Sequence, residues 1–162
     1  MTEKVQIQKT ESVFDEIEKI QDRILRRAYD LFVGNGGAPG KDLENWLTAE
    51  RELVWKPAIE LTEDNNVFKL KMAATGIDPK DLQIEVTPED LLVKAETRHE
   101  HKEDKGAVHK CEFECGSLFR TVHFPRKVDP DLVKAEFNNG LLTLTAPVAE
   151  EARARKVKIE AA

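Results

Sequence analysis

The feature that most constrains the fold is a two-residue alternation of apolar and polar side chains between about residues 67 and 145. Phe68, Leu70 and Met72 alternate with lysines, for example. Successive side chains of a strand point to opposite faces, so this period predicts strands that bury one face. Turn residues separate the segments, and Asn139-Gly140 is the strongest hairpin signal among them. Many short strands at close spacing predict a mainly β protein, an antiparallel β-sandwich of immunoglobulin-like type.

Before residue 55 the apolar residues follow a helical period. They recur at three- and four-residue steps between Val13 and Phe32, and again between Leu43 and Val54. The glycine-rich stretch 34–40 interrupts the pattern, so we expect an α-helical hairpin ahead of the sandwich. The first ten residues are polar, and we expect them to be frayed.

The two helical stripes have two interpretations. Either they pack only on each other, or part of them forms a sticky arm for clients or an oligomer contact. The candidate residues for such a client-binding arm are Phe14, Ile17, Ile24, Leu31 and Phe32.

Charge and hydropathy exclude several classes of partner. The net charge is −6, which argues against binding to the phosphates of nucleic acid. No apolar run approaches the roughly 20 residues that span a bilayer. The N-terminus has no apolar stretch of signal-peptide type. We therefore expect a soluble, cytoplasmic protein with no membrane partner.

The histidines and cysteines do not form a recognisable site. Cys111 and Cys115 lie four residues apart in a strand-like segment, about 13 Å between Cα atoms, whereas a disulfide allows no more than about 7 Å. Free thiols are therefore expected, although oxidation between subunits stays open. Metal-ligand spacing is lacking around His99, His101 and His109, and no phosphate-binding glycine loop is present. We expect no metal, no cofactor and no enzymatic activity.

Several motifs from residue 55 onward resemble one family. They are Trp55-Lys-Pro, Gly76-Ile-Asp-Pro-Lys-Asp-Leu82, Phe119-Arg-Thr-Val-His-Phe-Pro125, Ala135-Glu-Phe-Asn-Asn-Gly-Leu-Leu-Thr-Leu144 and Val157-x-Ile159. Together they resemble the α-crystallin domain of bacterial and plant-type small heat-shock proteins. The signature positions are Ala135, Asn139, Gly140 and Leu142. Thr75 replaces the proline that is usual in the family.

A shorter resemblance covers residues 23–53. Arg27-Ala-Tyr-Asp-Leu-Phe32, Gly37-Ala-Pro to Trp46, and Ala49-Glu-Arg-Glu-Leu53 resemble a short bacterial domain of unassigned function. The expected division is a helical arm at 1–54, the sandwich at 55–147 and a C-terminal extension at 148–162.

The family resemblance implies an ATP-independent holdase chaperone. Such a protein binds unfolding clients, prevents their aggregation under stress, and self-associates into dimers and larger oligomers. The alternative is a CS-type co-chaperone or adaptor, which shares the sandwich but binds one folded partner.

The resemblance also implies two assembly contacts. Val157 and Ile159 would enter a neighbour's groove between the strands at 82–86 and 118–124, unless they form a final strand on their own domain. The groove residues are Leu82, Ile84, Val86, Leu118, Val122 and Phe124. The charged loop 98–110 would be exchanged between dimer partners, unless it is simply solvated. Its dimerisation residues are Arg98, His99, His101, Val108 and His109.

Overall fold

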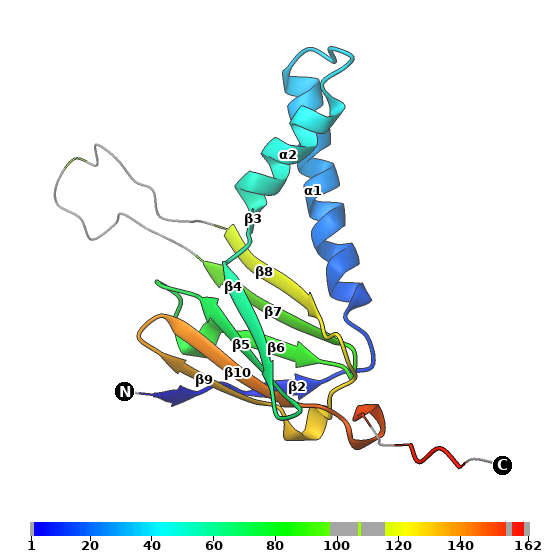
Figure 1. Cartoon of the computed structure of the whole chain (residues 1–162). Helices are drawn as coiled ribbons and strands as arrows, with labels where there is room; N and C mark the ends of the chain where they lie inside the picture. Colours follow the sequence, from blue (N-terminus) through cyan, green and yellow to red (C-terminus); the bar gives the residue numbers. More distant parts are fainter. Residues whose placement is uncertain (1, 98–106, 108–115, 155–156, 161–162) are drawn as a thin grey trace.

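Two facing β-sheets and a projecting helical hairpin make up the computed structural model, which describes residues 2–97, 107, 116–154 and 157–160 (Figure 1). The first sheet has the order β1 (Glu3–Lys4), β9 (Lys134–Asn138), β10 (Leu141–Pro147), β5 (Val67–Ala73) and β4 (Ile59–Asp64). The second has the order β2 (Ile7–Lys9), β6 (Gln83–Val86), β7 (Asp90–Thr97), β8 (Gly116–His123) and β3 (Val54–Trp55). The predicted sandwich with a preceding hairpin is confirmed.

Neighbouring strands are antiparallel except for two pairs at the edges of the second sheet. There β2 runs parallel to β6, and β3 runs parallel to β8. Three short 3-10 turns, Pro79–Asp81, Pro130–Leu132 and Glu150–Ala152, connect or follow the strands. Each parallel pair is made by a segment that adjoins the helical hairpin, so the hairpin's two flanks both dock on the second sheet.

The predicted alternation decides which side chains fill the sandwich. Phe68, Leu70 and Met72 point inward from β5 and are buried, whereas Lys69 and Lys71 between them are exposed. The aromatic ring of Phe68 lies 5.6 Å from that of Phe124, centroid to centroid, and the two are tilted against each other. Burial of such large apolar side chains is the main favourable term in forming the sandwich.

The β9–β10 hairpin turns at the predicted Asn139-Gly140. Both residues have positive φ, 50° and 80°, as a type I′ turn requires. Glycine is needed at 140 for a second reason: a Cβ there would lie 2.8 Å from Thr75 Oγ1 and 3.1 Å from Thr75 Cα. The signature glycine therefore serves close packing between this turn and the chain after β5.

We expect Gly140→Ala to lower the free energy of unfolding by about 2 kcal/mol, because it adds a strained φ and a contact with Thr75. Chemical denaturation followed by circular dichroism measures the loss. The matched control is Asn139→Gly, which keeps an allowed φ and is expected to change stability by less than about 1 kcal/mol. Equal losses in the two variants would contradict this explanation.

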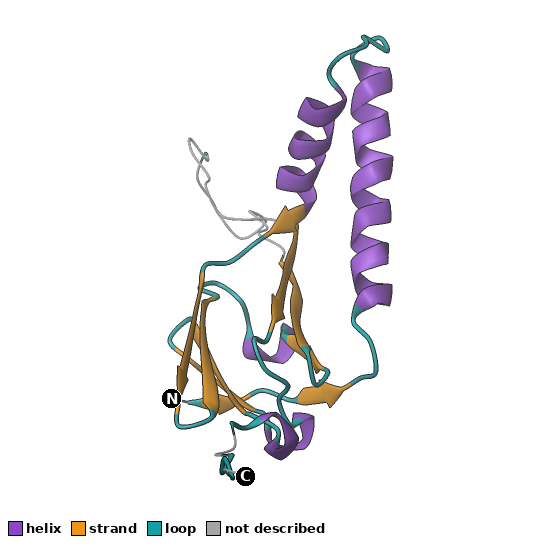
Figure 2. Cartoon of the chain, turned by 45° about the vertical axis from the view of Figure 1, so that its right-hand side comes forward, coloured by secondary structure: helices purple, strands orange, loops and turns teal. Residues whose placement is uncertain are grey.

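The hairpin consists of α1 (Phe14–Gly34) and α2 (Asp42–Leu53), which project from one end of the sandwich (Figure 2). Their apolar stripes pack on each other around a small core of their own. Its buried members are Ile20, Ile24, Ala49 and Val54, and the partly buried Phe119 of β8 packs against them. The two stripes therefore do pack on each other, and Phe119 ties the hairpin core to the second sheet.

Polar contacts also attach α1 to the outer face of the second sheet. The ammonium group of Lys94 lies 2.9 Å from the Glu16 carboxylate, and this hydrogen bond holds the pKa of Glu16 below its ordinary value. Arg23 donates to the Ser117 hydroxyl at 3.1 Å, and that hydroxyl donates to Glu96 at 2.8 Å. These contacts orient the first half of α1 along the sheet.

Candidate functional site

One open side of the sandwich lies between β6 and β9, and residues 3–10 cross it from one sheet to the other. β1 pairs antiparallel with β9, so that Glu3 lies opposite Phe137, and the backbone N–H of Val5 donates to Ala135 at 3.2 Å. β2 then pairs parallel with β6 over three residues, with Ile7 opposite Ile84. We call the facing backbone rows of β6 and β9 the β6–β9 edge. The N-terminal segment therefore supplies a short extra strand to each sheet.

Two apolar side chains anchor this segment. Val5 is 8% exposed and joins the sandwich core, and Ile7 is partly buried against the same core. Gln6 and Gln8 alternate with them and face solvent. The expectation that the first ten residues are frayed was wrong, because strand edges supply partners that the local sequence does not reveal.

The groove expected between the strands at 82–86 and 118–124 is not formed between them. β7 lies between β6 and β8 in the same sheet and pairs with both. All six expected groove residues are buried in the sandwich: Leu82, Ile84, Val86, Leu118, Val122 and Phe124. The correction concerns strand order. The added N-terminal segment pairs with β6 and with β9, which lie on the same open side of the sandwich. β8 is not part of this side, because β7 separates it from β6.

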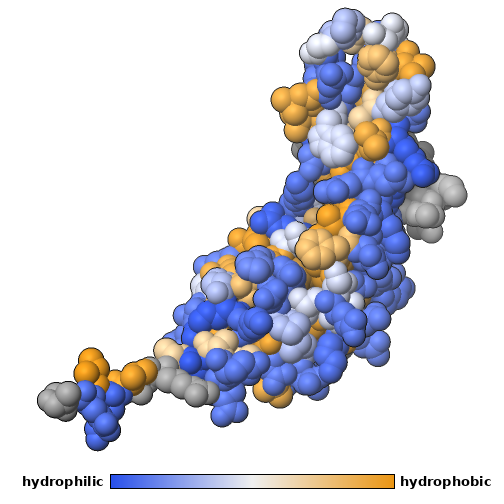
Figure 3. Space-filling view, turned by 90° about the vertical axis from the view of Figure 1, so that its right-hand side faces the viewer, coloured by the Kyte–Doolittle hydropathy of each residue, from blue (hydrophilic) through white to orange (hydrophobic). Residues whose placement is uncertain are grey.

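The C-terminal motif lies free of the sandwich. The chain stays attached as far as Ala152, which packs against the sandwich core and whose carbonyl accepts a hydrogen bond from Arg126 at 3.5 Å. Beyond it, Val157 and Ile159 are 83% and 93% exposed. They do not form a final strand on their own domain in the part of the chain that the structure describes. Figure 3 shows the apolar side chains at this end of the chain standing clear of the main body.

The hairpin exposes apolar side chains that its core does not use. Leu25, Tyr29 and Val33 recur every four residues along α1, and Leu43 and Leu47 do the same on α2. Of the five expected arm residues, Phe14 is exposed, Ile24 is buried, and Ile17, Leu31 and Phe32 are partly buried. The expectation missed the exposed set because the apolar stripe is wider than the face that the two helices share. The four-residue spacing on the outer side was the available signal.

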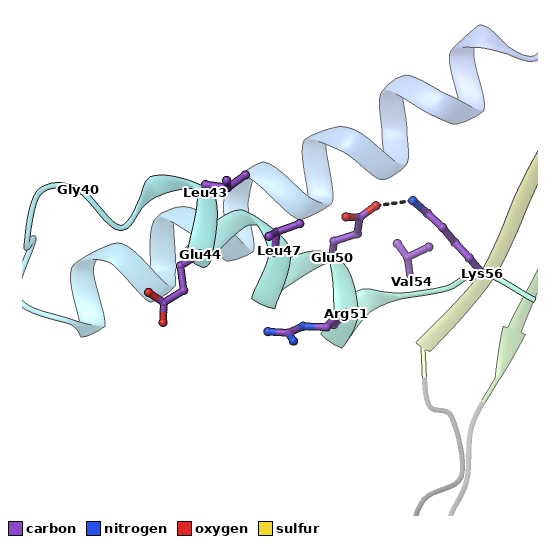
Figure 4. A pocket seen from close by; sticks show the side chains of 8 residues that line it. All are labelled: Gly40, Leu43, Glu44, Leu47, Glu50, Arg51, Val54 and Lys56. Carbon is purple, nitrogen blue, oxygen red and sulfur yellow. Dashed lines mark hydrogen bonds and ion pairs between the residues drawn. The ribbon is translucent and has the colours of Figure 1, made fainter.

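A shallow groove of about 690 Å³ runs along the outer side of α2 (Figure 4). Its apolar residues are Leu43, Leu47 and Val54. Glu50 and Lys56 close one end with an ion pair of 2.6 Å. The groove thus combines apolar walls with a charged rim.

The remaining predicted residues fall into two groups. Ala135 and Leu142 are buried in the sandwich and Asn139 and Gly140 form the turn, so the signature has a structural role. The five dimerisation residues (Arg98, His99, His101, Val108 and His109), together with Cys111 and Cys115, lie outside the described residues.

Within the described ranges, no three or more His, Cys, Asp and Glu side chains gather as metal ligands would. No helix in the same ranges has the length and apolar character to cross a membrane.

The comparisons with known proteins agree with this geometry. Residues 60–160 match the Hsp20/alpha crystallin family, and residues 21–54 match a family described as a protein of unknown function, DUF2934. The chain is 26% identical over 113 residues to small heat shock protein C2 of Rickettsia felis, covering 70% of this chain and 72% of that one. It is 32% identical to the 16.9 kDa class I heat shock protein 3 of Oryza sativa subsp. japonica, covering 67% and 70%.

Solved structures show the same sandwich. Heat shock protein 16.0 of Schizosaccharomyces pombe superposes with a TM-score of 0.56 at 29% identity, covering 65% of this chain and 99% of that one. A small heat-shock protein of Xylella fastidiosa, whose structure is described as a distinct high order structure, has a TM-score of 0.54 at 25% identity, covering 66% and 98%.

Proposed function

Because the chain belongs to the Hsp20/alpha crystallin family, we propose that it is a holdase chaperone that needs no ATP and keeps unfolding proteins from aggregating. The observation that carries the proposal is the exposed apolar surface of the hairpin. Six large apolar side chains of the two helices are exposed: Phe14, Leu25, Tyr29, Val33, Leu43 and Leu47. Exposed apolar clusters of this kind mark interaction sites.

A holdase binds its clients through weak, non-specific burial of apolar surface. An unfolding protein exposes apolar segments of many different sequences. The protein that binds it therefore needs exposed apolar area rather than a shaped pocket. The stripe of Leu25, Tyr29 and Val33 presents such area on a rigid helix, and charged residues around it keep the free surface hydrated. Each contact is weak, and an assembly that carries many copies would gain avidity.

Self-association is the second part of the proposal. Val157 and Ile159 lie two residues apart, so an extended backbone places both on one face. A segment of this kind can add to the strand edge of another subunit, with backbone hydrogen bonds for affinity and pockets for the two side chains. We propose that the exposed tail links subunits in this way and so multiplies the hairpins in one particle.

The test is the aggregation of a thermolabile enzyme such as citrate synthase, followed by static light scattering at constant elevated temperature. At an equimolar ratio and with no nucleotide present, we expect scattering to be strongly suppressed, and addition of ATP to change nothing. Serum albumin at the same mass is the control. Unchanged scattering at a molar excess of the chain would contradict the holdase proposal and favour an adaptor for one folded partner.

A pair of variants assigns the capture surface. Leu25→Ser with Tyr29→Ser removes exposed apolar area from α1, and we expect the amount of enzyme protected to fall at least about twofold. Glu18→Ser with Gln21→Ser is the matched control, since both residues are exposed on the same helix. Equal protection by the two variants would remove the outer face of α1 from the proposal.

A further inference from the structure

The exposed apolar row of α1 begins where the helix leaves the sandwich. Arg23 still reaches the second sheet, where it donates to Ser117 at 3.1 Å. From the next turn onward, Leu25, Tyr29 and Val33 are 58%, 64% and 57% exposed. The second half of α1 projects past the sandwich together with α2 (Figure 2). A helix that packs only on α2 would carry polar side chains on this side, so the row indicates a partner.

The α1 row and the α2 groove lie on the same face of the hairpin. A second cavity, of about 400 Å³, lies between the hairpin and β8, and Gln21, Glu50 and Val54 are among the residues that line it. Glu50 and Val54 also line the groove along α2. Leu25 lies one turn after Gln21, on the same side of α1. One face of the hairpin therefore presents a ridge of one helix beside a groove of the other.

We propose that this face pairs with the same face of a second copy, so that two hairpins form a four-helix bundle. A two-fold axis parallel to the helices sets α1 of each chain against α2 of the other. All neighbouring helices are then antiparallel, as in an up-down-up-down bundle. The pairing gives a role to residues 21–54, which match a family of unknown function. It goes beyond the holdase proposal and does not depend on the tail.

Two contacts within the hairpin fix which residues of α1 and α2 lie at the same height. Arg27 donates to Glu52 at 2.6 Å, and Asn35 donates to Asn45 at 3.3 Å. A step of one residue up α1 therefore corresponds to a step of about one residue back along α2. A two-fold axis parallel to the helices preserves these heights between chains. The same contacts thus set the register of α1 of one chain against α2 of the other.

In this register the α1 row enters the α2 groove of the second copy. Tyr29 of one chain arrives between Leu47 and Val54 of the other, and Val33 arrives between Leu43 and Leu47. A ridge of side chains at four-residue spacing packs into a groove in this way. The two-fold symmetry makes the contact twice, because each chain contributes both a ridge and a groove.

The charged rim is complementary in the same register. Each chain carries two ion pairs, Asp22–Arg26 at 3.0 Å and Glu50–Lys56 at 2.6 Å. Asp22 of one chain arrives at the height of Lys56 of the other, and Arg26 arrives within one turn of Glu50. Opposite charges face each other at both positions. Such a match selects among partners, so it favours a second copy over an unrelated protein.

The size of the contact fits reversible pairing. The ridge and the groove contribute five exposed large apolar side chains from each chain. At on the order of 100 Å² each, and with the stems of the flanking charged residues, the two chains bury about 1,200 Å². This is the lower end for specific interfaces. Pairing covers the rows that the holdase proposal assigns to client binding, so a hairpin binds a client only while it is unpaired.

Pulsed electron double resonance measures the contact directly. The full chain carries Cys111→Ser, Cys115→Ser and Ala38→Cys, so that a single nitroxide label stands in the loop between α1 and α2. We expect a label-to-label distance of about 25 Å or less, because neighbouring helix axes in a bundle lie about 8–10 Å apart. The distance should persist when Val157→Ala and Ile159→Ala remove the proposed tail link.

Tyr29→Ser and Asp30→Ser are the matched pair of variants. Both residues are exposed, and a helical step of about 100° places only Tyr29 on the row. We expect Tyr29→Ser to reduce the population at the short distance at least about fivefold and Asp30→Ser to leave it unchanged. Absence of the short distance from the parent chain, or equal populations in the two variants, would overturn the proposal.

A charge exchange tests the register without a change in the apolar row. Asp22→Lys and Lys56→Glu each place like charges across the contact, and each should lower the short-distance population about threefold. The chain with both changes restores opposite charges and should regain most of the population; failure to regain it would overturn the proposed pairing. These variants stay informative if Tyr29→Ser disturbs the hairpin. The light-scattering assay is separate, so loss of pairing and loss of chaperone activity are told apart.

Discussion

A chain that carries Val157→Ala together with Ile159→Ala is expected to form assemblies at least about twofold lower in mass than the parent chain. The two side chains are 83% and 93% exposed in the single chain, so their removal costs the subunit no packing of its own. What is lost is the apolar pair that would enter a neighbour's strand edge. Size-exclusion chromatography with multi-angle light scattering measures the mass directly.

Lys158→Ala is the control for that variant. Lys158 lies between the two apolar residues and, in an extended segment, points to the opposite face. It changes the same tail by one side chain and leaves the apolar pair intact, so the mass should stay at the parent value. An unchanged mass in the double variant, or an equal fall in both, would show that the Val-x-Ile pair is not the link.

Local pattern was sufficient to predict both helices and the central strands of this fold. The alternation around Phe68, Leu70 and Met72 places a strand and its buried face, and Asn139-Gly140 places a turn. The stripes before residue 55 place both helices, and the glycine-rich stretch separates them. These features depend on side-chain period and backbone φ, which are properties of neighbouring residues.

The order of the strands in the sheets could not be predicted from the alternation of apolar and polar residues. Nothing local shows that β7 pairs with both β6 and β8, so the expected groove was assigned to the wrong pair of strands. Residues 3–9 were missed for a related reason. They contain two apolar residues, Val5 and Ile7, too few to predict a strand, and they become ordered because β9 and β6 offer free edges. Lys4-Val5-Gln6-Ile7 has the same pattern as Lys156-Val157-Lys158-Ile159, and this repeat was the signal that could have drawn attention to them.

The hairpin and the sandwich edges are connected in a simple way. The chain enters α1 directly after β2 has closed one open side of the sandwich, and it leaves α2 into β3, which pairs with the outer edge of β8. Each flank of the hairpin thus covers an edge of the second sheet.

Ala49→Asp is expected to detach the hairpin while the sandwich stays folded. Ala49 is fully buried between α1 and α2, beside Ile20 and Ile24. A carboxylate in this apolar core loses its hydration, which costs about 4 kcal/mol at neutral pH. Helices of 21 and 12 residues are marginal on their own in water, so loss of their shared core should lower the helical circular dichroism signal.

The two tryptophans separate the two cores in this experiment. Trp46 packs against the hairpin core and Trp55 against the sandwich core. With each tryptophan left alone through a Trp→Phe change of the other, the emission of Trp46 should shift to longer wavelength in the Ala49→Asp chain, and that of Trp55 should not. Burial raises the pKa of the new carboxyl group, so the penalty is full at neutral pH. It is relieved as the pH falls through that raised value, and part of the hairpin should return.

Leu47→Asp is the matched control for Ala49→Asp. It introduces the same side chain two residues earlier in the same helix, at a position that already faces solvent. The carboxylate stays hydrated there, so helicity and both emission maxima should remain near those of the parent chain. A simultaneous shift of both tryptophans in the Ala49→Asp chain would show instead that hairpin and sandwich unfold as one unit, joined through Phe119 and the Lys94–Glu16 ion pair.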